Sequence, residues 1–390
     1  MVRQSLFTRW FAIVFTASLA TELSNSLLVH FPGFLLGFGA NEARIGTIVA
    51  LAGVASIGAR PWMGRIMDRH SRRLVIRWGT VLTALATLAY AFVDEIGPLV
   101  IGARLLQGLG QAMTATAFWT YISDRFPAEK RAQGVALFGI SGLIPLALGP
   151  GLGDLLLGTA GYDGLFFLAS GLALVAFALT LFLEKTGVHH GATPIGFWAV
   201  LRLRHMAPVW VGTFALSLGF TAAFVFVKTY VTTSGLETVG PYFLAYGSTA
   251  ILWRLGFSWV PDRVGPSRMI TPALLLYALG MTILGVGGSQ AVLALAGLAT
   301  GLGHGIGYPV MLALSTLRTT KGDRGAATAI FTAIFDLALI GMPPVLGLTI
   351  SLFGYRSMFW ATAVTIVIGL IVVRRLDLRA GSTTSPAPSP

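Results

Sequence analysis

The sequence predicts an all-α membrane protein in which twelve transmembrane helices form two six-helix, pseudo-symmetric halves. Three observations lead to this fold class. Only 11% of the 390 residues are charged and 55% are hydrophobic, whereas soluble domains carry about 25% charged residues. Twelve apolar runs are long enough to cross a bilayer, which takes roughly 20 residues. A charged motif also occurs twice, about half a chain apart.

The repeated motif relates the two halves to each other. The stretch R-P-W-M-G-R-I-M-D-R-H-S-R-R, from Arg60 to Arg73, has a weaker copy, R-L-G-F-S-W-V-P-D-R-V-G-P-S-R, from Arg254 to Arg268. A second repeated pair begins at Arg131 and Arg324, with R-A-Q-G-V-A-L-F and R-G-A-A-T-A-I-F. Parallel repeats of this kind are typical of membrane transporters built from two similar bundles.

The longest internal loop divides the chain. We expect an N-terminal half over 1–183, a cytoplasmic linker over 184–206, a C-terminal half over 207–375, and a disordered tail over 376–390 that is rich in Ser, Thr and Pro. The expected spans are 8–31, 43–64, 73–93, 97–120, 132–157, 162–183, 207–231, 239–259, 267–286, 290–315, 325–351 and 355–373.

Lysine and arginine predict the orientation. Twelve crossings place both termini on one side, and most of the 27 Lys and Arg residues fall in the loops of that side. The asymmetry predicts cytoplasmic termini. We also expect a monomeric protein in a bacterial plasma (inner) membrane. The asymmetry also accounts for the net charge of +12 without a nucleic-acid partner, because the sequence has no contiguous basic face.

Other classes of function have little support. The chain has no cysteine, so thiolate metal sites and disulfides are excluded. Its six His residues lack the H-x-x-x-H or H-E-x-x-H spacing of zinc sites, and no nucleotide loop or nucleophile elbow occurs. We therefore expect no metal, no cofactor and no enzymatic activity. A membrane sensor or scaffold is disfavoured because the sequence contains no large soluble domain.

Three motifs resemble signatures of the major facilitator superfamily. G-R-I-M-D-R-H-S-R-R, from Gly64 to Arg73, resembles the signature between the second and third helices, although the family usually has Gly in place of Ser71 and a small residue in place of Met67. R-L-L-Q-G-L-G-Q-A, from Arg104 to Ala112, resembles the fourth-helix signature. G-P-G-L-G, from Gly149 to Gly153, resembles the fifth-helix signature of antiporters. The resemblance covers nearly the whole chain and implies the major facilitator fold, most similar to that of the proton-coupled drug and sugar efflux branch.

The charged motif and its copy are candidates for a conformational latch. Asp68 can pair with a neighbouring arginine or face a helix N-terminus, and the resemblance implies that this cluster holds the two halves in one arrangement. Alternatively, the loop charges only fix the topology. Arg60 and Arg254 either extend to the surface or pair with Asp68 or Asp262. The other latch candidates are Gly64, Arg69, Arg72, Arg73 and Arg263.

A bend is expected in the fifth span. Pro150 removes a backbone hydrogen bond, while Gly149 and Gly153 allow close packing. Because proline and glycine are also tolerated in ordinary membrane helices, the motif alone does not establish export.

Glu22 and Asp336 are the predicted proton-coupling residues. Both lie near the middle of a span, where a charge costs about 2.5–3.5 kcal/mol on insertion scales. A carboxyl group in that position can take up and release a proton during transport. The alternative for each is a structural role, in the case of Asp336 a hydrogen bond to a neighbouring helix.

The predicted substrate-binding residues lie on spans that the resemblance places around a central cavity. Arg104 would compete with the proton for a carboxylate or bind an anionic substrate, unless it only satisfies backbone carbonyls. Lys228 either attracts an anion or extends to the surface, and His304 is either a site residue or a packed histidine. The remaining candidates are Asn25, Phe224 and Tyr308.

These expectations describe transport by alternating access, in which the halves rock around a midplane site. The predicted function is proton-coupled antiport that exports small organic molecules, drug-like or sugar-like. The alternative is a substrate-specific symporter or uniporter for a metabolite, an anionic one if Arg104 and Lys228 bind it. The expected partners are the substrate, protons and the lipid bilayer.

Overall fold

The computed structural model describes residues 8–69, 71–125, 137–184, 197–257, 259–319 and 324–382. All regular structure in these ranges is helical. Eight helices in the described part are long and apolar enough to cross a membrane. The last of these eight helices contains two crossings. Three further helices, which are shorter or more polar, complete the twelve crossings that the sequence predicted.

The N-terminal half contains six crossings. The first is a continuous segment in which a 3-10 turn joins two α-helices. The elements are α1 (Arg9–Leu27), η1 (Leu28–His30), α2 (Phe31–Gly37), α3 (Glu42–Arg69), α4 (Arg72–Tyr90), α5 (Pro98–Arg125), α7 (Ile140–Thr159) and α8 (Gly161–Thr180).

The C-terminal half repeats this arrangement. Its last element spans two crossings, separated at Gly354, whose φ of 81° is accessible to glycine but strained for other residues. The elements are α9 (Phe197–Leu201), η2 (Arg204–Met206), α10 (Ala207–Thr233), α11 (Gly240–Gly256), α12 (Val260–Val264), α13 (Pro266–Val286), α14 (Gln290–Leu317) and α15 (Arg324–Ser382).

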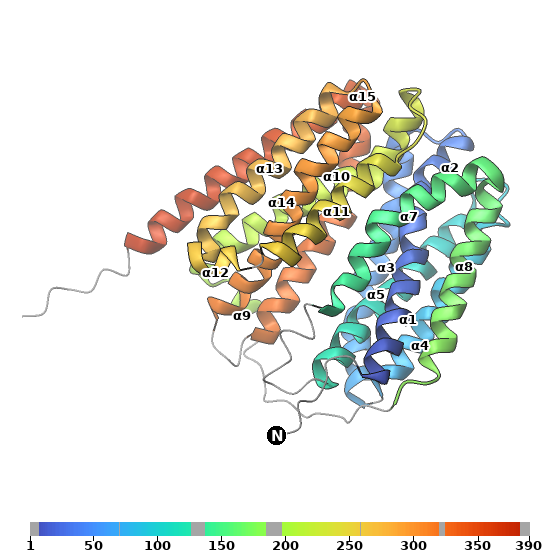
Figure 1. Ribbon diagram of the computed structural model, residues 1–390, viewed down its shortest axis with the longest axis horizontal. Helices are drawn as coiled ribbons and strands as arrows, with labels where there is room; N and C mark the ends of the chain where they lie inside the picture. Colours follow the sequence, from blue (N-terminus) through green and yellow to red (C-terminus); the bar gives the residue numbers. More distant parts are fainter. Residues whose placement is uncertain are drawn as a thin grey trace, which may run out of the picture.

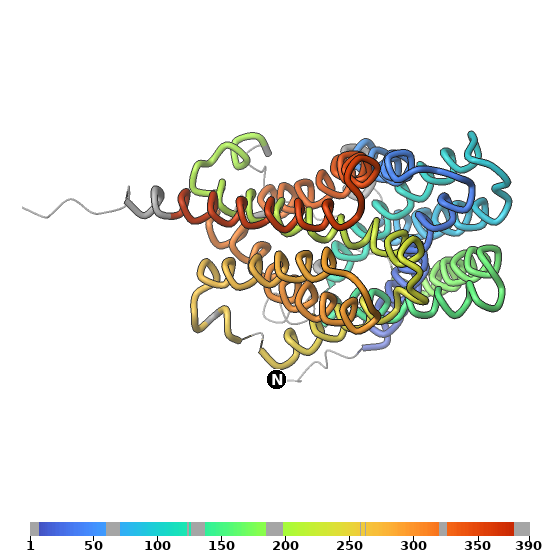
Figure 2. The backbone as a smooth tube through the Cα atoms, turned by 90° about the horizontal axis from the view of Figure 1, so that it is seen from above, coloured from blue at the N-terminus to red at the C-terminus, as the bar shows by residue number. Residues whose placement is uncertain are grey.

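Two bundles stand side by side, one from each half (Figures 1 and 2). We call the side where α1 begins the terminal side and the other the opposite side. The bundles touch along two seams, α3 against α15 and α7 against α11. In Figure 1 they lie together at the top and diverge towards the bottom, which is the terminal side.

Small residues make the seams possible. A Cβ atom at Gly46 of α3 would collide with the carbonyl of Pro343 in α15. One at Gly247 of α11 would collide with Ala147 of α7. Glycine at these positions lets the two backbones approach closely, as is common where membrane helices pack.

The two ends of the C-terminal half differ from the expected boundaries. Residues 376–382 continue α15 instead of joining a disordered tail. Asp377 accepts a hydrogen bond from Arg318 at 3.1 Å, and this ion pair ties the helix end to the bundle. The expected linker over 184–206 contains α9 and η2, and its residues 185–196 lie outside the described part.

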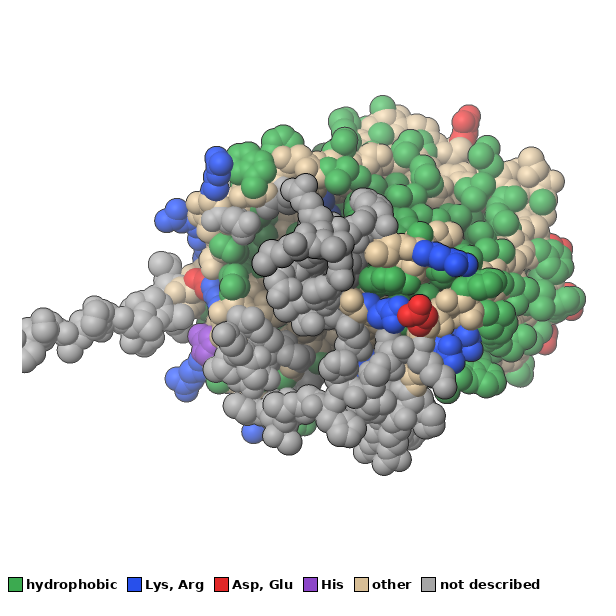
Figure 3. All heavy atoms as spheres, turned by 60° about the horizontal axis from the view of Figure 1, so that its bottom comes forward, with side chains coloured by type: hydrophobic (Ala, Val, Ile, Leu, Met, Phe, Trp, Pro, Cys, Tyr) green, Lys and Arg blue, Asp and Glu red, His purple; other side chains and the backbone are tan. Residues whose placement is uncertain are grey.

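Charged side chains gather on the terminal side. Figure 3 turns this side forward, and Lys and Arg side chains lie at the left edge of the described surface and near its centre, some beside an acidic side chain. The flanks of the bundle instead expose large apolar side chains, among them Leu155, Leu174 and Leu252. Apolar flanks with charged ends are what an integral membrane protein requires.

Candidate functional site

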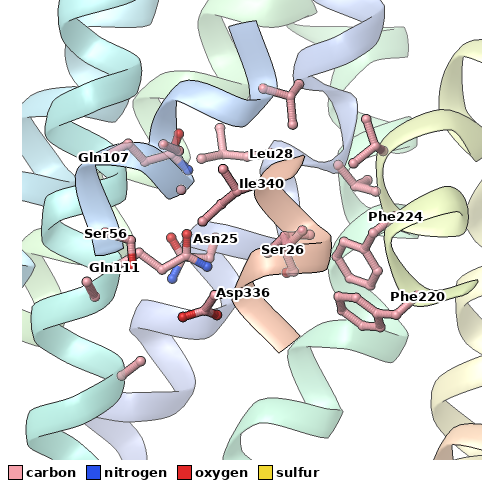
Figure 4. Close-up of a pocket in the computed structure, with 18 of the residues that line it drawn as sticks. Asn25, Ser26, Leu28, Ser56, Gln107, Gln111, Phe220, Phe224, Asp336 and Ile340 are labelled. Atoms are coloured by element: carbon pink, nitrogen blue, oxygen red, sulfur yellow. The ribbon is translucent and has the colours of Figure 1, made fainter. Parts of the chain in front are cut away.

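A cavity of about 340 Å³ lies between the two halves. Residues of α1, α3, α5 and α7 line it from the N-terminal half, and residues of α10 and α15 line it from the C-terminal half. Figure 4 shows side chains from both halves converging on this space. Five residues selected from the sequence therefore line one cavity: Glu22, Asn25, Arg104, Phe224 and Asp336.

The wall from the N-terminal half is polar. Glu22 and Asn25 lie one turn apart on α1, and Gln107 and Gln111 lie one turn apart on α5. Both polar atoms of the Asn25 amide are buried and fall short of good hydrogen-bond geometry among the described residues, although the Glu22 carboxyl lies beside this amide. No ion pair involves Glu22 in this part of the chain. The wall thus offers hydrogen-bonding groups to whatever enters the cavity.

Asp336 brings a second carboxyl group from the other half. It lies on α15, twelve residues after the helix begins at Arg324. Figure 4 shows its side chain extending from α15 towards the side of the cavity that bears Asn25 and Gln111. A single cavity therefore holds one acidic residue from each half, although these residues are far apart in the sequence.

Arg104 is engaged by its own bundle. Its guanidinium donates to the Val49 carbonyl of α3 at 3.2 Å and to Gln107 Oε1 at 2.5 Å. It also lies 5.0 Å from the centroid of the Phe31 ring. These hydrogen bonds satisfy a backbone carbonyl and a side-chain amide. They agree with the alternative in which Arg104 has a structural role and does not bind the substrate.

The wall from the C-terminal half is aromatic. Phe220 and Phe224 of α10 stack with ring centroids 4.5 Å apart and an interplanar angle of 18°. His304 of α14 is buried behind them, 5.6 Å from the Phe220 ring, and stacks on Tyr308 at 5.4 Å. His304 and Tyr308 do not line the cavity themselves, so they support the aromatic wall from behind.

Lys228 lies away from the cavity, nearer the opposite side. Its ammonium group donates to Asp154 Oδ1 of α7 at 2.8 Å, and both side chains are almost fully buried. Asp154 is the main residue that the sequence reasoning missed. It is an acid within an apolar span, directly after Gly153, and this placement could have identified it.

The glycine–proline motif of α7 packs against the first span. The helix is continuous from Ile140 to Thr159 through Pro150. A Cβ at Gly149 would collide with Ser26, and one at Gly153 with His30. His30 Nε2 lies 2.8 Å from the Pro150 carbonyl that it hydrogen-bonds. The motif therefore brings α7 close to the first span.

The predicted latch is only partly described. Side-chain surroundings are not described for five of the candidates: Arg60, Gly64, Asp68, Arg69 and Asp262.

The other latch candidates have different neighbours. Arg73 donates to the Leu183 carbonyl at 3.1 Å, Arg72 is buried, and Arg263 stacks 4.5 Å over Trp259. Arg254 lies near Tyr246 and Tyr308, and its Nε has no hydrogen-bond partner in the described structure.

Two bundles around a central cavity, with hydrogen-bonding groups on one wall and aromatic rings on the other, have the architecture of a secondary transporter. The Major Facilitator Superfamily model matches residues 6–260 and 255–389, so the chain belongs to that family. It is a membrane transporter of this type and not an enzyme.

Relatives and solved structures agree with this assignment. The chain is 24% identical over 365 residues to the uncharacterized MFS-type transporter YhhS of Escherichia coli K12, covering 90% of this chain and 88% of the relative. The YhhS of Salmonella typhimurium LT2 is also 24% identical, over 375 residues, covering 93% and 91%.

Among solved structures, a single-residue mutant of the nucleoside transporter NupG superposes with a TM-score of 0.80 at 13% identity, covering 94% of this chain and 100% of that one. A single-residue mutant of the peptide transporter POT gives 0.77 at 14% identity, with 94% of each chain covered. At this level of identity the likeness shows the fold alone.

Proposed function

We propose that this chain is a proton-coupled antiporter that exports small organic molecules. The observation that carries this proposal is the pair of acids, Glu22 and Asp336, which line one cavity from opposite halves. A carboxylate inside a membrane protein is costly to keep charged unless a cation or hydrogen-bond donors compensate it. A proton and a substrate can both compensate it, so they compete for the same groups.

Competition produces antiport when the two ligands favour different arrangements of the halves. A proton arriving from one side displaces the substrate, and a substrate arriving from the other displaces the proton. Only a ligand with different affinities for the two arrangements shifts the balance between them. Both acids belong to the surfaces that move apart as the halves rock, which supports their role in coupling.

The two walls favour an amphipathic substrate. Its polar part would meet Glu22, Asn25 and Gln111, and its apolar part would meet Phe220 and Phe224. A positively charged group suits this cavity, because it pairs with carboxylates and is attracted to aromatic faces. The anionic alternative has less support, since Arg104 is hydrogen-bonded within its own half and Lys228 is paired outside the cavity.

The charge distribution supports cytoplasmic termini in a bacterial inner membrane. With that orientation the bundles diverge towards the cytoplasm, so a substrate could enter the cavity from inside the cell. We include a monomeric state in the proposal, because one chain supplies both walls of the cavity.

The test is transport in proteoliposomes under an imposed pH gradient. Substrates are first found by a thermal-shift screen that includes organic cations and sugars. We expect the parent to accumulate a substrate against its gradient when protons flow the other way. In Glu22→Gln and Asp336→Asn the gradient should no longer drive accumulation, while exchange of labelled for unlabelled substrate persists.

The matched control is Asp377→Asn, which removes an acid that pairs with Arg318 far from the cavity. It should retain gradient-driven transport. Unchanged pH-driven accumulation in both cavity variants would contradict the proposal. Accumulation driven by protons flowing with the substrate would instead establish symport.

A further inference from the structure

A buried charged cluster joins the two halves near the opposite side. Asp154 of α7 belongs to the N-terminal half, whereas Lys228 of α10 and the start of α11 belong to the C-terminal half. The Asp154 and Lys228 side chains are 8% and 9% exposed. A charged pair this deeply buried is costly unless both partners are well compensated.

Asp154 makes three bonds across the seam. Its Oδ1 accepts from Lys228 Nζ at 2.8 Å, and its Oδ2 accepts from the backbone N–H groups of Val239 at 2.7 Å and Gly240 at 2.9 Å. These N–H groups lie at the N-terminus of α11, where backbone N–H groups have no acceptor within the helix. The helix dipole also favours a negative charge at this end. One carboxylate thus satisfies two separate elements of the other half.

Two further polar side chains, of His30 and Tyr162, lie around Asp154. His30 Nδ1 lies 3.8 Å from Asp154 Oδ1, while its Nε2 is engaged with the Pro150 carbonyl. Tyr162 of α8 is near enough to interact electrostatically with Asp154. Next to the carboxylate, Gly151 and Gly240 bring the α7 and α11 backbones into contact. Polar bonds and close packing therefore coincide on this seam.

We propose that Asp154 is a gating residue that holds the opposite side of the transporter closed. Opening that side requires α7 and α11 to separate, which breaks all three bonds together. The separation leaves Lys228 without its carboxylate and the α11 N-terminus without its acceptor. The bonds stabilise the arrangement in which the cavity is sealed from the opposite side, whatever the substrate or the coupling ion is.

The experiment measures distances between spin labels, because the chain has no cysteine and accepts introduced pairs without background. Thr159→Cys with Glu237→Cys spans the halves on the opposite side. Phe182→Cys with Leu317→Cys spans them on the terminal side. Double electron–electron resonance in nanodiscs reports both distances in the parent and in Asp154→Ala.

We expect Asp154→Ala to shift both pairs in opposite directions, lengthening the opposite-side distance and shortening the terminal-side distance. The ratio of molecules open on the opposite side to molecules closed there should rise on the order of tenfold or more, because three bonds are lost at once. A tenfold change corresponds to about 1.4 kcal/mol. Asp154→Asn keeps an acceptor for α11, and Lys228→Met keeps both α11 bonds, so each should shift the distances less.

Three outcomes decide the proposal. Unchanged distances in folded Asp154→Ala would overturn it, as would a longer opposite-side distance without a shorter terminal-side one, which indicates local loosening. If Asp154→Ala does not fold, Asp154→Asn and Lys228→Met decide by the same distances. The control Asp377→Asn removes an ion pair within one half and should leave both distributions unchanged. No step depends on transport, so the result is independent of the proposed antiport.

Discussion

The two walls of the cavity come from halves that repeat one sequence pattern, yet they differ in chemistry. The N-terminal wall carries hydrogen-bonding groups such as Glu22, Asn25 and Gln111. The C-terminal wall presents the stacked rings of Phe220 and Phe224, supported by His304. Among the described residues of the C-terminal half, Asp336 is the one acid in the cavity lining.

The difference indicates how a symmetric scaffold becomes a selective site. The repeat provides two bundles that can rock against each other, and this motion needs similar backbones only. Binding needs different side chains on the two faces. We expect the polar wall to control coupling and the integrity of the site, and the aromatic wall to control substrate affinity.

The largest effect is expected from Arg104→Leu on the polar wall. This change removes the donor to the Val49 carbonyl and to Gln107, and hydrogen bonds from charged groups contribute about 1.5–3 kcal/mol each. The thermal midpoint should fall measurably and transport should be lost. Arg104→Lys, which lacks the forked geometry of guanidinium, should recover only part of the stability. A fully stable, active Arg104→Leu protein would show that the residue has no organising role.

The second prediction concerns the aromatic wall. Phe220→Ala and Phe224→Ala each remove one ring that the apolar part of a substrate would contact, and an aromatic contact contributes about 0.5–1.5 kcal/mol beyond area burial. KM should therefore rise by up to about tenfold, while the dependence on the pH gradient stays the same. Initial-rate transport at several substrate concentrations separates the two parameters. A change in coupling without a change in KM would reverse the assignment of the two walls.

A smaller effect is expected from Asn25→Leu. The buried amide lies beside Glu22 but is not fully hydrogen-bonded among the described residues, and an unsatisfied buried polar group costs about 1–3 kcal/mol of stability. Replacing it should leave the thermal midpoint unchanged or raise it, and should weaken substrate binding. Thermal unfolding with and without substrate measures both effects. A less stable variant with unchanged binding would mean that Asn25 is structural.

The smallest effect is expected from His304→Phe. His304 is buried among Phe220, Tyr246 and Tyr308 and lies behind the cavity lining. A phenylalanine keeps the ring contacts, so transport should stay within about twofold of the parent, as for volume-conserving changes in a core. Loss of transport in a stable His304→Phe protein would place this residue in the binding site after all.

Charge within the expected spans identified three of the residues that line the cavity, Glu22, Arg104 and Asp336. An ionisable residue inside a span usually faces a cavity or a partner, and the resemblance to the family supplied the expectation that these spans surround a central cavity. The same rule applied to Asp154, an acid within the span that carries the glycine–proline motif, predicts a partner for it, which the structure shows to be Lys228. Phe224 could not be distinguished from other aromatic residues, because nearly every membrane helix carries some.

The sequence by itself determined the number of crossings and the two-fold repeat, and it predicts the orientation. Each of these depends on local hydropathy and on the placement of charge along the chain, which folding does not change. Only the tertiary structure decided which charges meet. Lys228 pairs with Asp154, 74 residues away in the sequence, across the seam between the two bundles. Arg104 instead donates hydrogen bonds to Val49 and Gln107 of its own bundle. Such pairings depend on distances between helices, and these are set by packing at the seams.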